Sequence, residues 1–116
     1  MPPAGTLMGS GPDLASLLDE LALASPGVER RTTGDLVEYS TGGRAFATRD
    51  AEGRTAFRLR SDVGRAALGT PDVSASSRGP DWIVLAPATA DRFARDRATA
   101  WFEHARKQAA EERPPH

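Results

Sequence analysis

The chain has 116 residues, with fifteen basic and sixteen acidic side chains, and it contains no cysteine. A net charge close to zero provides no global field that would draw the protein to nucleic acid or to an anionic membrane. The lack of cysteine excludes thiol chemistry, cysteine-based zinc sites and disulfide frameworks. It also favours a reducing compartment, so we expect a cytoplasmic protein.

The two ends of the chain differ in composition from its middle. Residues 1–10 have no basic head and no continuous apolar run, which predicts a disordered lead-in with neither a signal peptide nor a membrane span. Residues 112–116 are expected to form a frayed polar tail. A single domain is therefore expected over residues 11–111, and a chain of this length is sufficient for one core.

Segments with helical and strand-like patterns alternate along this domain. Residues 13–24 carry leucines at helical spacing, and a serine-proline-glycine sequence is expected to end that helix. Glycine-bearing turns follow Tyr39 and Arg49, which predicts a meander of three antiparallel strands. Between the turns, apolar and polar side chains alternate, so each strand should have one apolar face.

The second half is expected to begin with a short helix that runs through residue 68. Residues 72–76 are predicted to form an edge strand, and the apolar run 82–86 a central one. Thr89 is the expected cap of a final helix over residues 90–110, whose alanine and aromatic residues recur at helical spacing.

These elements define a fold class. Their expected order is helix, three strands, helix, two strands, helix. Both terminal helices carry apolar stripes, which can cover one face of a sheet. The sequence therefore predicts an α+β fold in which an antiparallel sheet of about five strands is covered on one face by N- and C-terminal helices.

Side chains suited to catalysis are scarce. His104 is the single histidine of the expected domain, and its charged neighbours favour a solvated position on the last helix over a catalytic role. Gly42, Gly43 and Arg44 precede a strand-like segment, whereas a phosphate-binding loop opens a helix, so we interpret them as a hairpin turn. We expect no enzyme activity, no metal site and no cofactor.

The largest apolar side chains belong to Trp82 and Trp101, which fall on neighbouring elements. We expect the two rings to pack against each other in the core, in preference to forming a platform on which a ligand stacks. Tyr39 is expected to be a core residue as well.

One basic pattern carries a functional hypothesis. In a regular pleat, Arg54, Arg58 and Arg60 project from one side of a strand, with Arg44 and Arg49 near the adjoining hairpins. Such a stripe on an open sheet face can contact phosphate groups. The alternative interpretation, an ordinary exposed polar face, is favoured by the residues alone.

Six short motifs occur in a characteristic order along the domain. They are Ser25-Pro26-Gly27-Val28, Gly43-Arg44-Ala45-Phe46-Ala47, Phe57-Arg58-Leu59-Arg60, Pro71-Asp72-Val73, Trp82-Ile83-Val84 and Ala100-Trp101. In this order and spacing the chain resembles the YjbR/MmcQ family of small bacterial proteins. The resemblance implies a frataxin-like α+β fold and DNA binding through a double-wing arrangement. The chain departs from the family pattern at Thr33, where an aromatic residue is frequent, and at Arg44, where a lysine is frequent.

A looser similarity connects the chain with the uncharacterised bacterial domains called luciferase-like. The glycine-rich hairpin, the tryptophan strand and the closing helix are similar in both. Those domains often carry histidines after the hairpin, where this chain has Thr48 and Arg49.

Two functions from different classes follow. In the first, which the resemblance implies, DNA is contacted by the arginines Arg44, Arg49, Arg54, Arg58 and Arg60. In the second, the protein is a protein-interaction or small-ligand-binding module without a nucleic-acid role, which a concave pocket near Trp82 or an exposed apolar patch would favour. Near-neutral charge opposes strong non-specific DNA affinity, because counterion release needs several phosphate contacts. The oligomeric state stays open.

Overall fold

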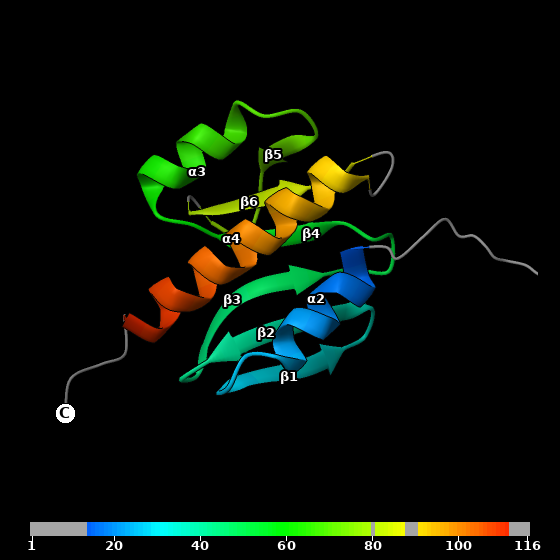
Figure 1. The fold of residues 1–116 in the computed structure, drawn as a ribbon, viewed down its shortest axis with the longest axis vertical. Coiled ribbons are helices and arrows are strands. Elements are labelled where there is room, and N and C mark those ends of the chain that lie inside the picture. Colours follow the sequence, from blue (N-terminus) through cyan, green and yellow to red (C-terminus); the bar gives the residue numbers. More distant parts are fainter. Residues whose placement is uncertain (1–13, 80, 88–90, 112–116) are drawn as a thin grey trace, which may run out of the picture.

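The computed structural model describes residues 14–79, 81–87 and 91–111 (Figure 1). These residues form one sheet of six strands and three helices. The α+β class predicted from the sequence is confirmed. Thr89, the expected cap of the final helix, lies outside the described residues, as do the predicted lead-in and tail.

The sheet is antiparallel throughout. Its strands are β1 (Val28–Thr33), β2 (Leu36–Thr41), β3 (Arg44–Arg49), β4 (Thr55–Arg58), β5 (Val73–Ala75) and β6 (Trp82–Leu85). The order across the sheet is β1-β2-β3-β4-β6-β5. The apolar strand β6 therefore lies inside the sheet and β5 forms an edge, as the sequence predicted.

The predicted number of strands was one too low. A single strand was predicted before the glycine turn that follows Tyr39, whereas the structure has two strands there, β1 and β2. Thr33 and Leu36 pair across a two-residue turn in which Gly34 has a φ of 60°. Glycine adopts this left-handed conformation without the steric cost that a side chain would incur, which allows the tight turn.

Two helices cover one face of the sheet (Figure 1). α2 (Leu14–Leu23) packs against β1 and against α4 (Arg92–Glu111), which crosses β2, β3 and β4. Phe102 of α4 contacts the rings of Tyr39 and Phe46 edge-on, with centroid distances of 5.8 and 5.1 Å. The prediction that N- and C-terminal helices cover one face is confirmed.

The remaining helix and the start of α4 complete the helical layer. α3 (Ser61–Leu68) packs against β5 and β6. The backbone N–H of Ala94 donates to Asp91 Oδ1 at 2.9 Å, so Asp91 caps the first turn of α4. Within the described part of the chain, no helix has the length and apolar character needed to cross a bilayer.

The other face of the sheet, which we call the open face, has no described helix on it. Glu38, Thr48, Ala56, Val84 and Ser74 pair in turn across β2, β3, β4, β6 and β5 and form one row. Tyr39, the neighbour of the first residue in this row, packs against α4. Because successive side chains of a strand alternate, the row belongs to the open face.

The two tryptophans lie on opposite faces of the sheet, so the prediction that they pack against each other was wrong. Trp101 contacts Phe57 on the helix side, with ring centroids 6.2 Å apart. Ile83 pairs with Phe57 in the sheet, which places its neighbour Trp82 on the open face. There the guanidinium carbon of Arg78 lies 4.5 Å from the centre of the indole ring.

Candidate ligand-binding hollow

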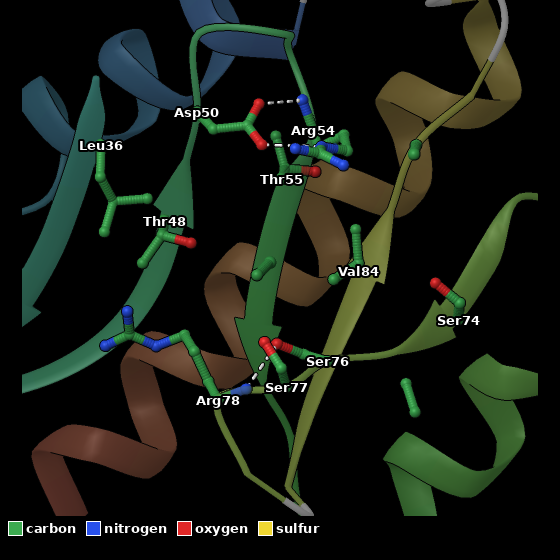
Figure 2. A pocket seen from close by; sticks show the side chains of 13 residues that line it. Leu36, Thr48, Asp50, Arg54, Thr55, Ser74, Ser76, Ser77, Arg78 and Val84 are labelled. Atoms are coloured by element: carbon green, nitrogen blue, oxygen red, sulfur yellow. Dashed lines mark hydrogen bonds and ion pairs between the residues drawn. The ribbon is translucent and has the colours of Figure 1, made fainter.

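The open face contains a hollow of about 690 Å³, shown from close by in Figure 2. Thr48, Ala56 and Val84 from the central row lie beneath it. The turn between β3 and β4 bounds one end, and the connection between β5 and β6, residues 76–79, bounds the other. Its volume is in the range of small-molecule sites, which typically occupy several hundred cubic ångströms.

Hydroxyl groups line much of the hollow. They belong to Thr48, Thr55, Ser74, Ser76 and Ser77. Thr55 donates to the carbonyl of Leu85 at 3.3 Å, and Ser76 Oγ accepts from the backbone N–H of Arg78 at 3.1 Å. The other three hydroxyls have no hydrogen-bond partner among the described residues, so a ligand can use them as donors or acceptors.

At the β3–β4 turn, the end of the hollow holds a carboxylate, Asp50, both of whose oxygens accept hydrogen bonds from the turn itself. Asp50 Oδ1 accepts the backbone N–H groups of Glu52 and Arg54 at 2.9 and 3.0 Å, and Oδ2 accepts Arg54 Nε at 2.7 Å (Figure 2). Burial alone would raise the pKa of Asp50, but these hydrogen bonds hold it below its usual value. Arg54 also pairs with Glu52 at 2.5 Å. Arg54 is thus held by two carboxylates of its own turn, and these three side chains sum to one negative charge.

The opposite end is dominated by Arg78. Its Nη2 donates to Glu38 Oε2 at 3.0 Å, and its guanidinium lies over Trp82. The side chain is 34% exposed, and its Nε and Nη1 groups have no partner among the residues described. The ionisable lining residues are Asp50, Arg54 and Arg78, which sum to one positive charge.

Arg49, one of the five arginines predicted to contact DNA, lies on the helix side of the sheet instead of the open face. Its Nη2 contacts Asp19 of α2 at 3.2 Å, and its Nε donates to the hydroxyl of Tyr39 at 3.1 Å. Tyr39 donates to Asp19 at 2.6 Å, and Arg30 approaches the same carboxylate at 3.4 Å. This cluster of Asp19, Arg30, Tyr39 and Arg49 joins α2 to the first three strands.

The electrostatics of this cluster are reflected in the pKa of Tyr39. Burial and the hydrogen bond to Asp19 raise the pKa of Tyr39 from 10.0 to about 12, although Arg49 acts in the opposite direction. The neutral hydroxyl is therefore the form that the fold stabilises.

The structure places the other four predicted arginines on different elements. Arg58 pairs in the sheet with Trp82 and belongs to the open face. Arg54 and Arg60 lie beyond the ends of β4, where Arg54 joins the Asp50 turn and Arg60 approaches Asp62 at 3.7 Å. Arg44 begins β3 at the preceding hairpin. Arg54 and Arg58 therefore share the open face, as predicted, whereas Arg60 lies beyond the end of the strand.

Of the residues that line the hollow, the sequence singled out Arg54, as a candidate phosphate contact, but not Arg78. Arg78 and the serines near it were predicted only as parts of an edge strand and a turn, and Glu38, the partner of Arg78, is 40 positions away. No local pattern signals such a contact. Among the described residues, no group of three or more histidine, aspartate or glutamate side chains is arranged to hold a metal ion.

Comparison of the chain with protein-family models, with curated proteins and with solved structures found no match. The fold and the hollow together describe an α+β domain whose antiparallel sheet has helices on one face and a polar hollow on the other. The likeness to the YjbR/MmcQ family stays a prediction.

Proposed function

We propose that the protein is a non-catalytic binding module that holds a small molecule in the hollow of the open face. The observation that carries this proposal is the hollow itself, because it combines an apolar base, a partly exposed arginine and hydroxyl groups that have no partner among the described residues. Small-molecule sites commonly have this composition of apolar walls and a few placed polar groups.

The chemistry of the lining favours binding over catalysis. Among the residues that the structure describes, the lining contains no histidine, cysteine or lysine. Its one carboxylate, Asp50, is engaged by three hydrogen bonds from its own turn, so it is a poor proton acceptor for the hydroxyls nearby. A serine or threonine without a base is a weak nucleophile, whereas it remains a good hydrogen-bonding group.

DNA binding through the arginines stays a prediction with less support. Arg49, Arg54 and Arg60 each have an acidic partner, at Asp19, Asp50 and Asp62. A phosphate would have to compete with these carboxylates. The arginines also lie on several elements, whereas strong phosphate binding needs several cations that act together.

The proposal is tested by nuclear magnetic resonance with isotope-labelled protein and a library of small polar fragments. Fragments that bind should shift the amide signals of Thr48, Ala56, Ser74, Ser77 and Val84 more than those of α2 and α4. Ala56→Leu, which adds a side chain at the base of the hollow, should weaken the same fragments. Ala110→Leu, an exposed change at the end of α4, is the matched control.

A second titration with duplex DNA separates the two functions. If the fragments shift only amide signals of residues that line the hollow, and DNA does not bind at low salt, the small-molecule proposal is supported. Fragments that bind only elsewhere, or not at all, contradict it. Salt-dependent DNA binding that Arg58→Ala weakens would support the arginine face instead.

A further inference from the structure

We infer that the small molecule held in the hollow carries a carboxylate, which Arg78 binds, and a short apolar body that lies over the base of the hollow. This inference rests on the proposed function and adds the chemical class of the ligand. It uses the charge, the free donors and the apolar surface of the lining.

The two arginines of the lining differ in what they leave for a ligand. Arg54 is held by two carboxylates of its own turn, Asp50 and Glu52, and these groups together keep a negative charge. Arg78 has a single carboxylate partner, Glu38, and its Nε and Nη1 groups have no partner among the described residues. A ligand carboxylate that reaches Arg78 would share the guanidinium with Glu38 through charge-assisted hydrogen bonds.

Arg78 is held in a position that leaves donors for a ligand. The indole ring of Trp82 packs against the guanidinium, and the terminal nitrogen Nη2 donates to Glu38. A stacked guanidinium keeps its N–H groups at its edge, where an anion can reach them. In Figure 2 the guanidinium lies near Thr48, whose hydroxyl has no partner among the residues described and is on the same side of the hollow.

The apolar part of the lining selects the body of the ligand. Leu36, Ala56 and Val84 contribute hydrocarbon surface between the two polar ends. Apolar burial favours a ligand with a short alkyl chain, and each methylene that becomes fully buried should tighten binding by up to about fourfold. A fully polar anion such as inorganic phosphate would leave this surface uncovered.

Glu38 gives the inference a sharp test, because its carboxylate competes with a ligand carboxylate for the same guanidinium. Glu38→Gln removes the competing charge, whereas Arg78→Gln removes the binding group. Both substitutions break the same ion pair. If the pair were merely structural, both would change the protein in the same direction; if Arg78 binds the ligand, affinity should rise in the first variant and fall in the second.

The experiment titrates isotope-labelled full-length protein with sodium hexanoate and with hexanamide, which is similar in shape and uncharged. Hexanoate should shift the amides of Thr48, Ser77 and Arg78, and it should bind more tightly than hexanamide and butyrate. Arg78→Gln should weaken hexanoate about tenfold or more, as expected for a charge-assisted hydrogen bond. Glu38→Gln should strengthen it severalfold. Arg106→Gln, which breaks an arginine–glutamate pair on α4, should leave binding unchanged.

Several results would overturn the inference. Equal binding of hexanoate and hexanamide in the hollow would reject the carboxylate while leaving the small-molecule function in place. A loss or a gain of hexanoate affinity in both the Arg78 and the Glu38 variants would show that the ion pair acts through structure. Shifts by neither probe would also reject the inference, and the fragment library would then decide the proposed function independently.

Discussion

Raising the pH through the range of tyrosine ionisation tests the cluster that fastens α2 to the sheet. Tyr39 is fully buried and its hydroxyl donates to Asp19 at 2.6 Å. Ionisation would place a phenolate in an apolar environment beside a carboxylate. These two effects raise the pKa of Tyr39 to about 12, against the opposing influence of Arg49.

The size and sign of the effect follow from this shift. One pKa unit corresponds to about 1.4 kcal/mol, so a rise from 10.0 to about 12 corresponds to roughly 2–3 kcal/mol. Because the folded-state pKa lies above the unfolded-state pKa, the contribution is fully present below pH 10. It is lost as the pH rises from about 10 to about 12.

The composition of the chain makes the assay specific. Tyr39 is its one tyrosine, so the ultraviolet absorbance of tyrosinate reports this side chain alone. The native protein should titrate with a midpoint near 12, and the protein in concentrated denaturant with a midpoint near 10. Urea unfolding at a series of alkaline pH values should show the corresponding loss of unfolding free energy.

Tyr39→Phe is the matched control, because it keeps the ring against Phe102 and removes the hydroxyl. The variant should be less stable at neutral pH and should lose less stability than the wild type between pH 10 and 12. A native titration midpoint near 10 would refute the reasoning. An equal alkaline loss in both proteins would also refute it, since the loss could not then come from Tyr39.

Three further predictions concern stability and are checked by urea denaturation. Phe102→Ala should lower the free energy of unfolding by about 3–5 kcal/mol, because this ring is fully buried. Phe93→Ala on the same helix is the control: its ring is 69% exposed, so the free energy of unfolding should change by less than about 0.5 kcal/mol. Asp91→Ala should cost about 1 kcal/mol through loss of the cap, and no change would mean that backbone solvation replaces it. Gly34→Ala should destabilise the folded protein by about 1–2 kcal/mol, because a side chain is strained at a φ of 60°. Gly64→Ala lies inside α3, where the added Cβ would be 3.9 Å from Leu59 Cβ, and it should stabilise the folded protein by roughly 0.5–1 kcal/mol. The same sign for both glycine variants would contradict this explanation.

Local signals were sufficient to predict the layout of the fold. Leucine spacing in α2, the proline and glycine after it, and the apolar run of β6 each act over a few residues. The extra strand was also within reach, since Gly34 and Asp35 form a glycine-containing pair of the kind that closes tight hairpins. The turn after Tyr39, with its two adjacent glycines, carries the stronger signal and marks the end of the first predicted strand.

The hollow depends on contacts that no local pattern contains. The sheet order places β6 between β4 and β5, which brings Ser74 beside Val84 and Val84 beside Ala56. The alternation of side chains along a strand divides them between two faces of the sheet, but in β6 all of them are apolar, so it does not show which of them contact the helices. For that reason Trp82 was expected to pack against Trp101, although its buried ring lies on the open face under Arg78.

Charge counting treats all arginines alike, and the structure shows why this fails. Arg49 is committed to Asp19 and Tyr39, and Arg54 to two carboxylates of its own turn. Arg78 has one carboxylate partner and a stacking ring, which together fix its position without using all of its N–H groups. What an arginine can offer to a ligand is set by the donors that its partners leave. By this criterion Arg78, which was not among the predicted arginines, is the residue at which mutagenesis of this protein should begin.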